Sequence, residues 1–201
     1  MSAFLKSFSY IFHPLFIPMG GTLAYFLITP KYVSLEQQSG NILPIFILTV
    51  IIPIIFFFIL KNLGLISSVF APSLKERRYP LIIGILLNLM VAYKVIPQNY
   101  IQEIYFFFVG LIIALGAVFL LLFLKVKTSI HLLGMSSLTM FLVGLSIHFE
   151  INITFAIALF TICTGLVATS RLYMKAHTKT ELLIGVLLGL TSQLVMLSYW
   201  L

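Results

Sequence analysis

The chain has 201 residues, of which 61% are hydrophobic, and twelve Lys or Arg and five Asp or Glu residues carry all of its formal charge, a net +7. Its mean hydropathy is +1.17. A water-soluble domain of this size cannot cover its surface with so few charged side chains, so the composition excludes a soluble globular fold. The basic residues lie in short segments between apolar runs, which is typical of membrane topology and argues against a nucleic-acid partner.

Seven apolar runs approach the roughly 20 residues that cross a bilayer as a helix. In chain order they are 7–28, 42–60, 81–96, 104–124, 132–147, 153–168 and 182–201. Three of them are short, so six spans with one re-entrant segment is the alternative. There is no internal repeat, and the longest loop covers about 61–80. We predict an all-α polytopic transmembrane bundle that forms a single integral membrane domain, 1–201.

The first run has features of a signal peptide, because Lys6 precedes an apolar stretch. It contains Pro14, Pro18 and two glycines, and no small-x-small cleavage site follows it, so we interpret it as a retained first span. His13 in this run and His148 at the end of a later one accompany no polar motif. We interpret both as interfacial residues.

Alternation of the runs across the bilayer distributes the charges unevenly. One face receives Lys6, Lys61, Lys75, Arg77, Arg78, Lys125, Lys127, Arg171, Lys175 and Lys179, and the other receives Lys31, Lys94, Glu36, Glu103 and Glu150. The positive-inside rule would place the basic face in the cytoplasm, unless several of these cations bind phosphate and are fixed by that chemistry.

Three polar segments follow the second, fourth and sixth runs. They read APSLKERRYPL, KVKTSIHLLG and TSRLYMKAHTKTELL. Since two spans separate each segment from the next, all three are predicted to emerge on the same membrane face.

The last of these segments carries the most specific chemistry. His177 and Glu181 lie four residues apart at the start of the last helix and therefore share a face. A carboxylate there can accept the imidazole Nδ1–H and leave Nε2 outward as a nucleophile. The positive end of the helix and the Arg171 fork both suit an anion.

The spacing of this segment closely resembles the last signature of the type 2 phosphatidic acid phosphatase superfamily, which reads Ser-Arg, five residues, His, three residues, Asp. Here Ser170 and Arg171 are followed by His177, with Glu181 in place of the Asp. The triplet at 129–131, Ser-Ile-His, is similar to the family's Ser-Gly-His core, and KERRYP at 75–80 looks like a shortened form of its Lys, six residues, Arg-Pro motif. The resemblance covers 75–189.

The resemblance implies a mechanism without metal or cofactor. His177 would attack phosphorus and form a phosphohistidine, Glu181 would orient it, and His131 would protonate the leaving oxygen. The phosphate ligands would be Lys75, Arg78, Ser129, Ser170 and Arg171. Arg77 is the alternative to Lys75 and Arg78. The helical Gly185 and Gly189 fit the family pattern but are interpreted as close-packing residues.

The expected activity is hydrolysis of a lipid phosphate or diphosphate, such as phosphatidate, phosphatidylglycerophosphate or a polyprenyl diphosphate, in a bacterial inner membrane. The family's usual site on the outer face and the charge rule disagree about the side, which stays open. Membrane lipids and the substrate are the partners implied, and no obligate protein partner is inferred. One alternative is a degenerate protein that binds or transports lipid phosphate. A zinc site built from the two histidines and the glutamate is another, although the surrounding cations disfavour a divalent ion.

Overall fold

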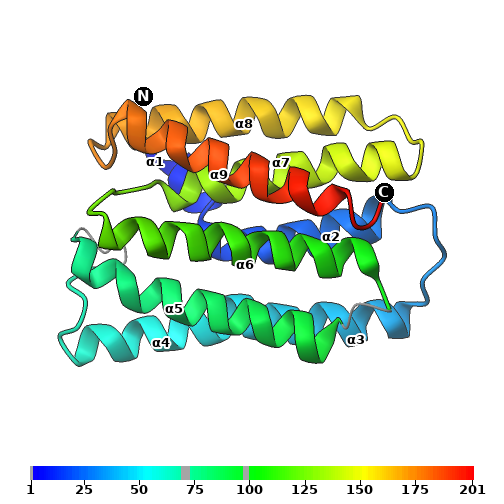
Figure 1. Ribbon diagram of the computed structural model, residues 1–201, viewed down its shortest axis with the longest axis horizontal. Coiled ribbons are helices and arrows are strands. Elements are labelled where there is room, and N and C mark those ends of the chain that lie inside the picture. The colour runs from blue at the N-terminus through cyan, green and yellow to red at the C-terminus, as the bar shows by residue number, and fades with distance from the viewer. Residues whose placement is uncertain (1, 69–72, 97–99) are drawn as a thin grey trace.

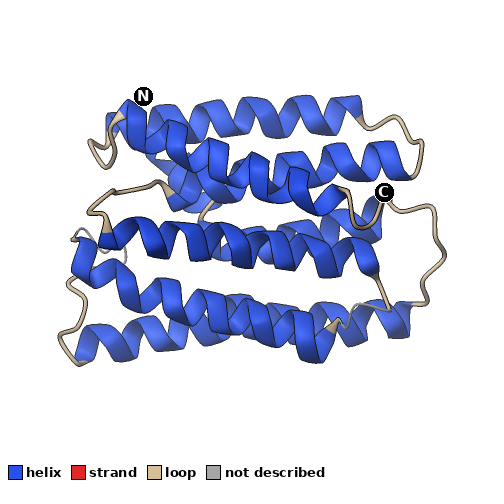
Figure 2. Ribbon diagram, viewed as in Figure 1, coloured by secondary structure: helices blue, strands red, loops and turns tan. Residues whose placement is uncertain are grey.

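The structure is a computed structural model that describes residues 2–68, 73–96 and 100–201, and this part of the chain is helical and contains no strand (Figure 2). The helices are α1 (Ser2–Ile11), α2 (Ile17–Ile28), α3 (Leu35–Phe46), α4 (Ile52–Asn62), α5 (Leu74–Met90), α6 (Gln102–Phe123), α7 (Ile130–His148), α8 (Thr154–Tyr173) and α9 (Lys179–Leu197). A short 3-10 turn, η1 (Pro14–Phe16), and two wider helical turns, η2 (Ile47–Ile51) and η3 (Val91–Val95), connect or extend them. The predicted all-α bundle is confirmed.

Seven helical stretches in the described residues are long and apolar enough to cross a membrane. They are Phe4–Ile28, Leu35–Asn62, Leu74–Val95, Gln102–Phe123, Ile130–His148, Thr154–Tyr173 and Lys179–Leu197. The predicted seven spans are therefore confirmed, and the chain is an integral membrane protein. The main differences are at the second and third spans, which begin at Leu35 instead of 42 and at Leu74 instead of 81. The loop expected to reach residue 80 is therefore shorter, and the KERRYP segment is helical.

The spans run side by side, and their connections gather at the two ends of the bundle (Figure 1). The start of α5, the α6–α7 connection and the α8–α9 connection lie at the same end as the N-terminus. The prediction that the three polar segments share one face is confirmed. We call this end the motif end.

Helix α7 lies at the centre of the bundle, and its residues from His131 to Leu138 are all buried. Helix α9 packs closely against it, because a Cβ at Gly185 would meet the carbonyl oxygen of Ser129, and a Cβ at Gly189 would meet the hydroxyl of Ser136. The two glycines thus bring the backbone of α9, whose first turn carries Glu181, into contact with that of α7, as their interpretation as packing residues requires.

The first span is broken near its middle. Helix α1 ends at Ile11, and His13 is extended, with φ −67° and ψ 140°, directly before η1 begins at Pro14. Proline disfavours helical conformation in the residue before it, so the sequence itself produces this break. The break turns the side chain of His13 toward the interior of the bundle.

Candidate functional site

A cavity of about 400 Å³ opens among the helices at the motif end. Its basic lining consists of His13, Arg77, His131, Arg171 and His177. The rest is almost wholly apolar and comes mainly from the η1–α2 region, η2, α4, α5, α6 and α7, with Thr49 and Asn88 as polar exceptions.

The cavity extends deep into the bundle along α5. Its lining on this helix runs from Arg77 to Asn88, which are eleven residues apart. At a helical rise of ~1.5 Å per residue this is about 16 Å, or roughly half the ~30 Å hydrocarbon thickness of a bilayer. The shape therefore combines a cationic end near the membrane boundary with an apolar pocket about one leaflet deep.

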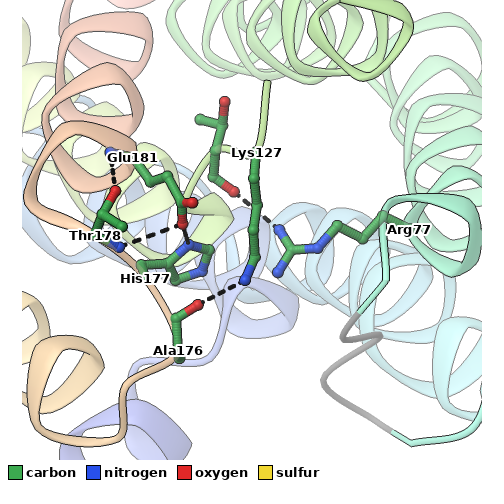
Figure 3. A network of polar contacts seen from close by, with 7 residues as sticks. Arg77, Lys127, Ala176, His177, Thr178 and Glu181 are labelled. Atoms are coloured by element: carbon green, nitrogen blue, oxygen red, sulfur yellow. Dashed lines mark hydrogen bonds and ion pairs between the residues drawn. The ribbon is translucent and has the colours of Figure 1, made fainter. Parts of the chain in front are cut away.

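His177 and Glu181 are joined by the hydrogen bond that the sequence predicted. Nδ1 of His177 lies 2.7 Å from Oε2 of Glu181 (Figure 3). Because the carboxylate accepts the proton on Nδ1, Nε2 of the neutral ring is the unprotonated nitrogen. The His177 side chain is only 2% exposed, yet the residue lines the cavity.

The local sequence explains why Glu181 is held so firmly. Helix α9 begins with a capping box in which Thr178 Oγ1 accepts from the Glu181 backbone N–H at 3.3 Å, while Oε2 of Glu181 lies 3.4 Å from the Thr178 backbone nitrogen. Ser or Thr at the cap with Glu three residues later is the usual pattern of this arrangement. The longer side chain that departs from the family's Asp thus both caps the helix and orients the imidazole.

Burial in this cationic region lowers the pKa of His177 to about 4. Loss of water contact is the largest cause, the hydrogen bond to Glu181 acts in the opposite direction, and Arg77, Arg171 and Lys127 lower the pKa further. The ring is therefore neutral at physiological pH, which is the state that a nucleophilic nitrogen requires.

Lys127 and Arg77 hold the connecting segments around His177 (Figure 3). Nζ of Lys127 donates to the carbonyl oxygen of Ala176 at 2.8 Å, and Nη1 of Arg77 donates to that of Thr128 at 3.0 Å. Burial, and then the positive charge of Arg77, lowers the pKa of Lys127. Several cations therefore surround a single carboxylate, that of Glu181.

His131 is tied to the first helix. Its Nε2 lies 3.1 Å from the carbonyl oxygen of Ser9, and since a carbonyl only accepts, Nε2 carries a proton. The hydroxyl of Ser9 is also 2.7 Å from that of Ser170 on α8. Helix α1, which carries none of the three motifs, thus contacts two of the residues selected from sequence.

The structure brings together some of the predicted site residues and not others. His131, Arg171 and His177 line the cavity, and Glu181 bonds to one of them. The remaining four selected residues, Lys75, Arg78, Ser129 and Ser170, are not among those that line it.

Each of these four has a definite position elsewhere. Lys75 is exposed, and Arg78 lies over the Phe123 ring, 5.5 Å from its centroid. Ser170 bonds to α1, and Ser129 is fully buried, with its backbone N–H donating to the carbonyl oxygen of Glu181 at 3.2 Å. The preference for Lys75 and Arg78 over Arg77 does not agree with these positions.

Two cavity residues were missed or ranked low from sequence. Arg77 is the second choice from sequence, because the comparison with the family's Lys, six residues, Arg-Pro motif favours Lys75 and Arg78. His13 was interpreted as interfacial because no motif surrounds it. The signal that could have found it is Pro14, which predicts a break in the span at this histidine.

In the described part of the chain, no three His, Cys, Asp or Glu side chains are grouped so that they could hold one metal ion. Comparison of the chain with protein-family models, with curated proteins and with solved structures gives no match.

Proposed function

We propose that the chain is a membrane lipid phosphatase of the type 2 phosphatidic acid phosphatase kind, which hydrolyses a lipid phosphate or diphosphate through a phosphohistidine. The observation that carries the proposal is a single cavity with two ends of different chemistry. One end has two arginines and an oriented neutral imidazole, and the other is an apolar pocket about one leaflet deep. A phosphate headgroup with a hydrocarbon tail has the same two parts.

The proposed reaction starts with attack of His177 Nε2 on phosphorus. The bond between phosphorus and the leaving oxygen breaks, the electron pair stays on that oxygen, and His131 supplies its proton. Because Nε2–H of His131 is given to Ser9, the transferred proton must be carried by Nδ1, which takes it from the monoanionic phosphate group as the substrate binds. Water then attacks the phosphohistidine and releases inorganic phosphate, while Arg77 and Arg171 stabilise the charge on the phosphoryl oxygens.

The apolar lining supports a lipid over a water-soluble phosphate ester. Helices α4 and α5 contribute much of this lining, and three of the α4 side chains that line the cavity, Ile54, Phe56 and Phe58, are also exposed. A tail could therefore reach the cavity from the bilayer without crossing a polar barrier. A bacterial inner membrane is the proposed location, with the membrane side left open.

The test is phosphate release from purified protein in detergent with a chelator present. Phosphatidate, phosphatidylglycerophosphate and a polyprenyl diphosphate are compared as substrates. We expect the wild type to release phosphate from at least one of them and His177→Ala to release none. Release that stops with chelator and returns with zinc would instead indicate a metal enzyme.

A second candidate is a protein that binds lipid phosphate without hydrolysing it. The observation that favours it is Ile130, which lines the cavity where the family has glycine and so occupies space beside the phosphate. Lipid phosphate that co-purifies or binds tightly, with no release from any of the three substrates, would select this function.

A further inference from the structure

We propose that His13 is a third histidine of the site and donates a hydrogen bond from Nε2 to a phosphoryl oxygen of the substrate. The inference rests on the proposed phosphate site and assigns to the first span a part in it. None of the three motifs includes this residue.

His13 lies within the basic end of the cavity. It lines the cavity beside His131, and the two rings meet edge to face with their centroids 5.2 Å apart. Arg171 also lines this end. A ligand that contacts His131 and Arg171 is therefore within the region that the His13 ring faces.

The position of His13 is fixed by the docking of α1. Ser9, four residues earlier, contacts both His131 and Ser170 through its carbonyl oxygen and its hydroxyl, at 3.1 and 2.7 Å. Pro14 then ends the helical path, so the chain at His13 is extended. These contacts hold the imidazole where a continuous helix would have carried it elsewhere.

The hydrogen bonds of His13 determine its tautomer. The backbone N–H of Leu15 donates to Nδ1 at 3.3 Å. Since Nδ1 accepts, the neutral ring carries its proton on Nε2. This nitrogen makes no hydrogen bond to any residue that the structure describes, so it is a donor available to the cavity.

Such a donor complements the arginines without adding positive charge. The basic end already holds Arg77 and Arg171, and a further cation would raise their mutual repulsion in the empty site. A neutral N–H group in a fixed orientation can still stabilise the negative charge that spreads over the phosphoryl oxygens.

The structural alternative is that His13 only caps η1 through Nδ1. Two substitutions separate the roles. In His13→Asn, the short amide can still accept from Leu15 N–H but cannot reach the position of Nε2. In His13→Gln, the longer amide can place an N–H near the position of Nε2 but loses the cap. The control is His148→Asn, the same change at a histidine on the opposite end of the bundle.

The experiment measures three quantities for each variant in detergent: the dissociation constant of inorganic phosphate, kcat/KM for lipid phosphate, and the unfolding temperature. We expect His13→Asn to keep the unfolding temperature and to weaken phosphate binding and kcat/KM by about 10- to 100-fold, the usual loss for a hydrogen bond to a charged group. His13→Gln should recover at least part of both while unfolding at a lower temperature. His148→Asn should leave phosphate binding unchanged.

The proposal is overturned if His13→Asn binds phosphate as the wild type does, or if both variants lose binding only in proportion to lost stability. It fails together with the proposed function if the wild type neither binds phosphate nor releases it. If the wild type binds phosphate without turnover, the proposed function fails, while weaker binding by His13→Asn still supports the third histidine.

Discussion

At the end of the bundle opposite the cavity, the carboxylate of Glu103 is 3% exposed and accepts from Nζ of Lys31 at 2.6 Å. His148 Nε2 lies 3.4 Å from the same oxygen, and its ring packs against Trp200, with centroids 5.3 Å apart. Around His177 at the motif end the balance is reversed, because Arg77, Arg171 and Lys127 act on its ring while Glu181 is the carboxylate that bonds to it. The end with Glu103 has packed rings, those of His148 and Trp200, whereas the motif end has the cavity.

The two ends differ in their balance of charge. Lys31 and His148 share one buried carboxylate, whereas Arg77 and Lys127 bond to backbone carbonyls and are in excess over Glu181. A buried acid with an ion-pair partner and packed rings is a stabilising arrangement once formed, and removing one partner is costly. Cations in excess around a cavity repel one another when no anion is bound. This repulsion lowers the free energy of unfolding of the ligand-free protein. Removal of a cation should therefore lower stability more at the Glu103 end than at the motif end.

The largest expected effect is that of Arg171→Met. Loss of the guanidinium should lower phosphate release by about 10²- to 10³-fold, the usual cost of removing one charge-stabilising donor. The variant relieves the repulsion between Arg171 and Arg77 but also removes the attraction between Arg171 and Tyr10, so the unfolding temperature should change little. Lys179→Met, which removes an exposed cation at the same end, is the control for net charge. A large loss of stability in Arg171→Met would show that the cation excess is structural.

Lys31→Met should have the complementary effect at the opposite end. It leaves the buried Glu103 carboxylate with His148 as the remaining basic partner, and we expect the free energy of unfolding to fall by about 1–3 kcal/mol. Phosphate release by the folded protein should not change. Denaturant unfolding in detergent gives the first quantity, and Lys31→Arg, which keeps the charge, should restore it. Lost activity without lost stability would contradict the comparison.

The pH dependence of kcat/KM tests the environment of His177. Its pKa is lowered to about 4, so the proposed nucleophile stays neutral at mildly acidic pH. Activity should be present above that value and be lost as the pH falls through it. In Lys127→Met one of the cations that lower the pKa is absent, so the acidic limb should move to higher pH. If the acidic side of the kcat/KM profile does not move, the charge of Lys127 does not act on the His177 imidazole.

The smallest effects are expected for Lys75→Ala and Arg78→Ala. Both side chains are exposed and lie outside the cavity lining, so each should change the activation free energy by less than about 1 kcal/mol, as is usual for exposed charges. Arg77→Ala, assayed beside them, should lose far more activity. Equal losses in all three variants would mean that the start of α5 is arranged differently in the working protein.

The sequence was sufficient for the features that depend on local patterns. Hydropathy predicted the seven spans, their parity predicted that the motifs share a face, and the four-residue spacing predicted the bond between His177 and Glu181. Hydropathy did not predict where α5 begins, because its first turns carry KERR. Once the helix begins at Leu74, Arg77 shares a face with Leu81, Gly84 and Asn88, while Lys75 points elsewhere.

Other features depend on contacts that no local pattern contains. The hydroxyls of Ser9 and Ser170 are 161 residues apart in sequence, and their contact removes Ser170 from the cavity lining. The carbonyl of Ser9 likewise selects the tautomer of His131. Both effects require α1 to dock beside α7 and α8, which is a result of tertiary packing.

The glycine contacts between α9 and α7 bear on how a lipid would enter. Gly185 and Gly189 bring these two helices into backbone contact. His131 is on α7, and His177, just before α9, is bonded to Glu181 on α9, so both imidazoles belong to this closely packed pair. Much of the tail pocket comes instead from α4 and α5, which lie at the other side of the bundle in Figure 1. A tail that enters can therefore displace α4 and α5 while the distance between the imidazoles of His131 and His177 stays the same.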